Sequence, residues 1–277
     1  GAAALGAGAL TGGAFPSWAW AVDGATLAAI LTNSVVNNDV PFAVAMTGNA
    51  DGITWSGAAG DAAPGVVANE TTVMRIFSMT KAIGSTAAMI LVDRGKLSPD
   101  TPVEEILPQF SEMKVLDGFN GDTPILRAPK AKATIRHLAT HTSGLVYEFL
   151  SSNTGRYMAV TGHPSVLSGL KASLHYPMMF DPGERWDYGI GIDWLGQAVE
   201  AVDGRRIDQF CREELLDPLG MSDTRFEVTL DMESRLAGVK MRGENGAFSD
   251  FDIAPPPNPE FYGMGHALYS TASDYMR

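Results

Sequence analysis

The apolar segment at residues 77–97, FSMTKAIGSTAAMILVDRGKL, constrains the fold more than any other part of the chain. It predicts a helix of about twenty residues with apolar side chains on more than one face. Other elements must cover such a helix on several sides, because its apolar surface would otherwise face water. The chain of 277 residues, 45% apolar and 19% charged, can supply this cover as one large domain or two ordinary ones.

Local patterns predict two elements before this helix. Residues 22–38 carry apolar side chains at helical spacing, and Asp23 is a candidate N-cap for that helix. Two β-rich runs within residues 41–57 flank the turn tetrapeptide NADG, which is typical of a β-hairpin.

Three further helices are predicted in the second half of the chain. The segment ATIRHLATHTSGL starts a short helix and ends at Gly144, a long apolar helix stops near Gly204, and residues 206–221 form the third. The hairpin supplies the only two strands that the patterns identify. Since an isolated hairpin is marginal in water, more strands or helices must pack on it.

The two ends of the chain carry separate signals. Residues 1–21 are small, apolar and uncharged and end in the tripeptide AWA, which resembles the apolar part and cleavage site of a secretory signal; a flexible Gly/Ala-rich extension is the alternative. Near the other end, Thr271 is a candidate N-cap with Asp274 three residues later, so a helix begins close to Arg277. We therefore expect the natural protein to continue and to supply the C-terminal strands of the sheet.

These patterns divide the chain into three parts. Residues 1–21 are the signal-like or flexible extension, and residues 22–75 are the N-terminal part of an α/β domain, with its helix and hairpin. Residues 76–277 form a mainly helical domain that contains the apolar helix. The signal-like start favours export to the periplasm, and without export the chain would be cytoplasmic.

Charge and cysteine content exclude several classes of partner. The chain has 32 acidic and 20 basic residues, a net charge of −12, and no basic run. It would repel nucleic acid and anionic membranes, so we expect neither as a partner. Cys211 is the only cysteine, which excludes an internal disulfide.

The pattern S-x-x-K occurs three times, at Ser78 and Lys81, at Ser111 and Lys114, and at Ser168 and Lys171. As a bare pattern it is weak, because about one chance match is expected in a chain of this size. The second pair lies in a polar loop, where the lysine would stay solvated and protonated. The third lies in a segment of mixed polarity, typical of a surface helix.

Ser78 differs because it stands near the first turn of the apolar helix. Free N–H groups and the helix dipole favour negative charge on an oxygen at that place. Lys81 follows on the same helical face, so its amine can reach the Ser78 hydroxyl. Burial by neighbours such as Phe77, Ile83 and Met89 would favour a neutral amine, the form that can accept a proton. A capping serine with a lysine that extends to solvent is the alternative.

The ordered motifs SMTK, IRHLATHTSGL, PGERWDYGIGIDWLG, DPLGMSDTRF and GHALYSTASDYMR resemble the serine β-lactamase and penicillin-binding-protein superfamily. Within it the chain is most similar to the family VIII carboxylesterases and the related fungal lovastatin side-chain acyltransferase. The resemblance implies an α+β fold, with an antiparallel sheet flanked by helices and a mainly helical domain. It also implies Ser78 as the acylated nucleophile, Lys81 as the group that assists its deprotonation, and Tyr188 as the second acid/base group.

Two departures from the superfamily bear on the substrate. Tyr188 is followed by Gly189 and Ile190, where lactam-acting members usually carry an amide side chain that contacts the substrate. The third motif, K-T-G, H-x-G or W-x-G, is not found, and the strand with the second oxyanion donor is expected beyond Arg277. The first departure favours esters over β-lactams.

Other constellations are weaker. His137 and His141 could face one metal ion, but Leu138 stands where a metalloprotease needs Glu and no third ligand is evident. No G-x-S-x-G elbow and no nucleotide-binding loop occurs, so we expect no metal and no cofactor. Three aromatic residues are candidates for the substrate pocket, namely Tyr147, Phe149 and Trp186.

The sequence thus predicts a serine hydrolase that cleaves short or medium acyl esters through an acyl-enzyme on Ser78. Two alternatives use the same acyl-enzyme chemistry. One is acyl transfer to an alcohol, and the other is β-lactamase or DD-peptidase-like activity. A catalytically silent binding protein is the alternative from another class. The expected partner is a small-molecule acyl ester, and the oligomeric state stays open.

Overall fold

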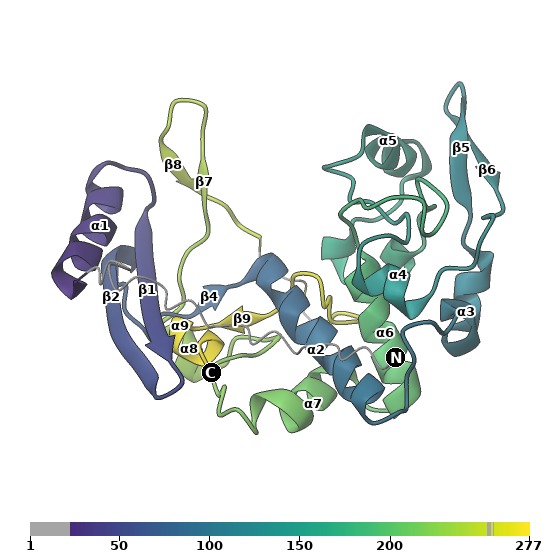
Figure 1. Cartoon of the computed structure of the whole chain (residues 1–277). Coiled ribbons are helices and arrows are strands. Elements are labelled where there is room, and N and C mark those ends of the chain that lie inside the picture. Colours follow the sequence, from purple (N-terminus) through teal and green to yellow (C-terminus); the bar gives the residue numbers. More distant parts are fainter. Residues whose placement is uncertain (1–22, 254–255, 257) are drawn as a thin grey trace, which may run out of the picture.

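The computed structural model describes residues 23–253, 256 and 258–277 (Figure 1). The predicted extension at 1–21 lies outside the described residues. Figure 1 shows a strand-rich part around α1, β1 and β2 and a helix-rich part around α4 and α6, with α2 between them. Every strand pair in the described part is antiparallel, which confirms the α+β class expected from the sequence.

The strand-rich part begins with the predicted helix and hairpin. Helix α1 (Gly24–Val36) starts at Asp23, whose Oδ1 accepts the Thr26 N–H at 2.8 Å. Strands β1 (Phe42–Asn49) and β2 (Gly52–Ala63) pair around the NADG turn, and β3 (Val66–Val67) extends the sheet in the order β1-β2-β3.

The apolar helix of the sequence is α2 (Thr80–Asp93), and a 3₁₀ turn at Phe77–Met79 precedes it. The helix is shorter than expected and buries one face, with Met89 41% exposed. The prediction that apolar residues are buried on more than one face was therefore wrong at Met89. Alanine, serine and threonine on the other side of α2 make the helix apolar in sequence without requiring burial.

A close approach at Gly84 fixes how α2 packs. A Cβ at this glycine would lie 2.9 Å from the Met264 Cβ and 3.2 Å from the Ile192 Cγ2. Ile192 belongs to α6 (Gly191–Asp203), the second long helix of the sequence, which ends as predicted before Gly204. The missing side chain thus lets α2, α6 and the segment around Met264 share one core.

The helix-rich part adds short helices around α6. These are α3 (Val103–Ile106), α4 (Ile135–Ala139), α5 (Ser152–Thr161) and α7 (Ile207–Cys211), which continues into a π turn at Arg212–Leu216. The core between them contains fully buried large side chains, among them Trp194, Tyr176, Phe210, Leu91, Ile135 and Leu138.

Two of these helices end earlier than predicted. Helix α4 stops at Ala139 rather than Gly144, because His141 adopts a left-handed backbone with φ of 56°. Helix α7 stops at Cys211, where wider π turns replace the α-helical hydrogen bonds of the expected third helix.

Several strands were not predicted. Strands β5 (Val115–Asn120) and β6 (Thr123–Arg127) form a hairpin where the sequence was interpreted as a polar loop. Strands β7 (Lys240–Arg242) and β8 (Phe248–Asp250) form a second hairpin. Strands β7 and β8 are mostly exposed, and the two buried residues of β5, Val115 and Leu116, are adjacent, so neither ribbon shows the alternation that identifies a half-buried strand.

The C-terminal segment returns to the start of α2. Strand β9 (Tyr269–Ser270) pairs with β4 (Met74–Arg75). The short helix α8 (Leu230–Glu233) precedes β9 in the chain. Helix α9 (Ala272–Tyr275) follows, and the Thr271 hydroxyl accepts the Asp274 N–H at 3.1 Å, which confirms the predicted cap.

None of the helices in the described part of the chain has the length and apolar character that a membrane span requires.

Candidate active site

Ser78 stands at the junction of β4 and α2. Strand β4 ends three residues earlier, and the Ile76 N–H donates to the Leu268 carbonyl at 3.0 Å, so the backbone is held just before the turn. Phe77 then adopts φ of 42°, a left-handed conformation that is strained for a residue with a side chain. The turn presents the Ser78 side chain at the exposed start of α2.

Lys81 lies one turn further along and is half buried. Its Nζ is 3.3 Å from the Ser78 Oγ, in agreement with the spacing argument from the sequence. The same nitrogen donates to the Gly265 carbonyl at 2.8 Å and to the Tyr147 hydroxyl at 3.1 Å. Three oxygens therefore fix the direction of the amine.

Tyr188 reaches the same serine from the loop before α6. Its hydroxyl donates to the Ser78 Oγ at 2.7 Å, and its ring centroid lies 4.5 Å from the Lys81 Nζ. The structure therefore brings together all three residues that the resemblance implied, although Tyr188 is separated from Ser78 by 110 positions.

His141 supports the Tyr188 ring. The two ring centroids are 4.8 Å apart, and the His141 Nδ1 accepts the Gly189 N–H at 3.4 Å. Burial and the nearby Lys81 charge lower the pKa of His141 to about 4, so the imidazole is neutral at pH 7. A neutral ring can accept this N–H, which a protonated ring could not.

The three predicted pocket residues occupy different positions. Tyr147 is buried, and burial raises the pKa of its hydroxyl, which contacts the Lys81 amine. Phe149 is 70% exposed and stacks on Tyr147 with centroids 4.9 Å apart. Trp186 is 64% exposed and stacks on Tyr188 at 6.5 Å. Phe149 and Trp186 thus offer exposed apolar surface close to the site, whereas Tyr147 belongs to the polar cluster itself.

The other two serine–lysine pairs are arranged differently. The Ser111 Oγ donates to the Pro108 carbonyl at 2.7 Å, and Lys114 is exposed. The Ser168 Oγ accepts the Leu170 N–H at 3.3 Å, and Lys171 is exposed. The segment around the third pair is not the expected surface helix: it consists of two 3₁₀ turns broken at Gly169, whose φ is 69°.

Both histidines of the pair that could face a metal ion make contacts within the fold instead. The His137 Nδ1 accepts the Thr134 N–H at 3.2 Å in a capping box at the start of α4, and His141 packs on Tyr188. In the part of the chain that the structure describes, no group of three or more His, Cys, Asp or Glu residues could hold a metal ion.

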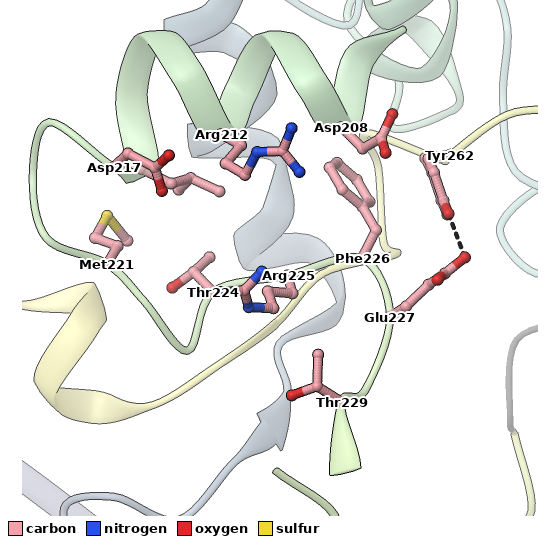
Figure 2. Close-up of a pocket in the computed structure, with 11 residues that line it drawn as sticks. Asp208, Arg212, Asp217, Met221, Thr224, Arg225, Phe226, Glu227, Thr229 and Tyr262 are labelled. Carbon is pink, nitrogen blue, oxygen red and sulfur yellow. Dashed lines mark hydrogen bonds between the residues drawn. The ribbon is translucent and has the colours of Figure 1, made fainter. Parts of the chain in front are cut away.

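Several cavities in the described part of the chain lie outside the serine site. Figure 2 shows one beside α7, which the side chains of Arg212, Arg225 and Asp208 help to line and where the Tyr262 hydroxyl donates to Glu227. A larger cavity, of about 460 Å³, has a mostly apolar wall that includes His266. Neither cavity is lined by the three clustered residues of the serine site.

Sequence reasoning missed the backbone partner of Lys81 and the second tyrosine on its amine. Gly265 opens the motif GHALYSTASDYMR, but it contacts Lys81 through its backbone carbonyl, a contact that the motif does not indicate. Tyr147 was noted only as an aromatic residue near HTSGL, and its contact with Lys81 depends on the fold that brings α2 against this loop.

Comparison with known proteins gives the family. The sequence profile of the family described as Beta-lactamase matches residues 18–277. The acyltransferase mokF of Monascus pilosus and the monacolin J acid methylbutanoyltransferase of Aspergillus terreus are each 34% identical to the chain over 74% of its length and 51% of theirs. The lovastatin esterase of Penicillium rubens is 33% identical over 74% of the chain and 53% of its own length. The chain thus spans about half the length of the curated relatives it matches.

Solved structures agree with this assignment. The unliganded simvastatin synthase LovD of Aspergillus terreus, in its selenomethionyl form, superposes with a TM-score of 0.80 at 30% identity, over 92% of the chain and 67% of that structure. A class C beta-lactamase shares the fold with a TM-score of 0.62 at 20% identity, over 88% of the chain and 59% of that structure. These matches confirm the resemblance drawn from the spaced motifs. The chain belongs to the beta-lactamase family.

Proposed function

We propose that the chain belongs to a serine carboxylesterase that forms an acyl-enzyme on Ser78. One observation carries the proposal: the Ser78 Oγ lies 2.7 Å from the Tyr188 hydroxyl and 3.3 Å from the Lys81 amine. A serine hydroxyl becomes nucleophilic when an adjacent base takes its proton, and both neighbours are within reach of it.

The reaction follows from these contacts. The Ser78 oxygen attacks the ester carbonyl carbon while its proton passes to the Lys81 and Tyr188 pair. Collapse of the tetrahedral intermediate breaks the bond to the alkoxide, which leaves with that proton. Water then attacks the acyl-enzyme, gives up a proton to the same pair and releases the acid and the free serine. A Ser78 N–H at the helix start would stabilise the developing oxyanion.

Two features favour esters over β-lactams. Ile190 stands where lactam-acting members usually have an amide, and its side chain is fully buried, so it contacts the core rather than a substrate. The exposed faces of Phe149 and Trp186 provide apolar surface suited to a short or medium acyl chain.

Acyl transfer is the second candidate, because the relatives include both a lovastatin esterase and acyltransferases. The same acyl-enzyme serves both reactions, and only the acceptor differs. An alcohol held on the exposed aromatic surface would compete with water for the acyl group.

The test is turnover of p-nitrophenyl butyrate by the full-length protein, with and without an added alcohol. We expect a burst of p-nitrophenol, then steady turnover, with free butyrate as the main product in water. Ser78→Ala should remove the burst, whereas Ser111→Ala and Ser168→Ala should keep it. A wild-type protein without burst or turnover would support a binding role instead. Ester as the main product with alcohol present would favour the acyltransferase, and rapid nitrocefin hydrolysis would favour the lactamase.

A further inference from the structure

The carbonyl that binds Lys81 belongs to a tight turn before β9. The Gly265 oxygen accepts from the Lys81 Nζ at 2.8 Å, the shortest of the three contacts of that amine. In Figure 1 the yellow segment that leads to β9 lies beside α2 and α6. The direction of the lysine therefore depends on what holds this turn in place.

A buried carboxyl group on α6 holds the turn. Asp193 lies in the first turn of α6 and is fully buried. Its Oδ1 accepts the Gly265 N–H at 2.9 Å, so the same glycine is bound on one side by Asp193 and on the other by Lys81. The partial positive charge at the start of α6 favours a carboxylate at this position.

The packing around the glycine is close. A Cβ on Gly265 would lie 2.6 Å from the Asp193 Oδ2 and 2.8 Å from the Tyr147 hydroxyl. No side chain fits there without moving one of these groups. Asp193 and Tyr147 thus enclose the glycine, and Tyr147 also contacts the lysine.

Burying this carboxyl group costs folding free energy, and hydrophobic packing does not explain why the group is buried. The Asp193 Oδ2 has no hydrogen-bond partner among the described residues, and burial raises the pKa of the group. His266 is the nearest basic side chain, with its Nδ1 3.8 Å from the Asp193 Oδ1, and burial lowers the pKa of that imidazole. Among the described residues, the hydrogen bond that Asp193 accepts from outside its own helix comes from Gly265.

We infer that Asp193 is a positioning residue for Lys81, which acts by holding the Gly265 backbone so that its carbonyl directs the amine at Ser78. This inference rests on the proposed function, because it assigns a task within the same reaction. The ionisable groups that face Asp193 are Lys81, Tyr147, Tyr176 and His266. None of them accepts the Gly265 N–H in its place.

The test compares Asp193→Asn with Asp193→Leu in the full-length protein. Asparagine keeps an oxygen that can accept the Gly265 N–H, whereas leucine has a similar volume and no acceptor. We expect the leucine variant to form the acyl-enzyme up to about 100-fold more slowly, the loss that a misplacement of about 1 Å can cause. Its KM should stay close to that of wild type, and the asparagine variant should acylate at nearly the wild-type rate.

Two readouts separate positioning from stability. Burst amplitude counts the active sites, so the acylation rate per site does not depend on how much protein is folded. The second readout is the split between the acylation rate and KM, because a loosened fold would weaken substrate binding as well as acylation, whereas a misdirected amine slows acylation alone. Asp203→Asn is the matched control: this carboxylate lies at the other end of α6 in an ion pair with Arg205, so it should affect stability and leave per-site acylation unchanged.

The outcomes are distinct. A leucine variant that acylates at the wild-type rate, or an asparagine variant as slow as the leucine variant, would overturn the inference. If the leucine variant does not fold, Gly265→Ala tests the same contact, since its Cβ displaces Asp193 or Tyr147, and wild-type acylation there would overturn the inference too. A wild-type protein with neither burst nor turnover would instead remove the proposed function, and this inference with it.

Discussion

Two residues of the site have an unusual backbone. Phe77, which precedes Ser78, has φ of 42°, and His141, which packs on Tyr188, has φ of 56°. Left-handed conformations cost about 1–3 kcal/mol for residues with a side chain and persist where the surrounding structure holds them. Both residues lie next to the three clustered side chains, so holding these side chains in place lowers the stability of the fold.

The same histidine gives a pH prediction. The folded-state pKa of His141 is about 4, below the ordinary value of 6.5, because of burial and the charge on Lys81. Between these values the unfolded chain binds the proton that the folded chain does not, so stability rises with pH through this window. We expect the thermal midpoint to fall as the pH drops from about 6.5 towards 4.

The check is a set of thermal melts of wild type and His141→Asn at several pH values. The variant should melt at a lower temperature near pH 7, because it lacks the ring contact, but should show a shallower fall with acid. His137, His163, His175 and His266 also have lowered pKa values, so a residual slope is expected. Identical slopes in the two proteins would contradict the assignment.

At the scale of single residues, the sequence predicts the proposed nucleophile and its acid/base partners better than the residues that hold them in place. Ser78 and Lys81 follow from spacing on a helix, and Tyr188 from the order of the motifs. Gly265 and Asp193 both lie within quoted motifs, but their contacts could not be predicted. Gly265 acts through a backbone carbonyl that any residue possesses, and an acidic residue in the first turn of a helix is usually a solvated one.

At the scale of elements, α2 depends on close contacts at its glycine. Gly84 faces Met264 and Ile192, and its Cβ would approach the Met264 Cβ to 2.9 Å. Alanine would gain about 1 kcal/mol of helix propensity. The clash involves a rigid part of Met264, so overpacking of about 1–3 kcal/mol should exceed that gain.

We therefore expect Gly84→Ala to lower the free energy of unfolding, measured by urea denaturation with an unchanged m-value. Gly155→Ala in α5 is the control, because its Cβ would meet only one backbone oxygen, at 3.3 Å. That variant should be neutral or slightly stabilising. A stabilised Gly84→Ala protein would show that α2 and α6 can separate without cost.

Elements were predicted well where the signal is local. The cap at Asp23, the NADG hairpin and the cap at Thr271 appear as expected, since each depends on a few adjacent residues. The pair β4 and β9 could not be predicted, because two-residue strands have no periodicity and their partners are about 195 positions apart. The ribbon β5–β6 was missed because its two buried residues, Val115 and Leu116, are adjacent and so do not alternate with exposed ones.

At the scale of the whole molecule, the division at residues 75 and 76 stays a prediction. The pairing of β4 with β9 brings the last described residues back to the strand that leads into Ser78. Helix α9 adds a contact, since the Tyr275 hydroxyl donates to the Met79 carbonyl at 2.8 Å. The turn that carries the serine is therefore held from both the N-terminal and the C-terminal sides of the chain.

The net charge of −12 gives a prediction for the choice of substrate. A strongly negative protein raises the local concentration of cations and lowers that of anions, and salt screens the effect with a Debye length of about 10 Å at 0.1 M. We therefore expect kcat/KM for acetylthiocholine to exceed that for its neutral isostere, 3,3-dimethylbutyl thioacetate, at low ionic strength.

The measurement is the ratio of the two kcat/KM values as salt is increased. Charge steering requires the ratio to fall towards a plateau, because added ions screen the field but leave the shape of the site unchanged. The plateau itself reports local recognition, to which the exposed rings of Trp186 and Phe149 would contribute by contact with the cation. Trp186→Ala should lower the plateau and leave the salt-dependent part unchanged. A ratio that does not vary with salt would mean that the excess acidic groups of the protein lie too far from the path of the substrate to attract its cation.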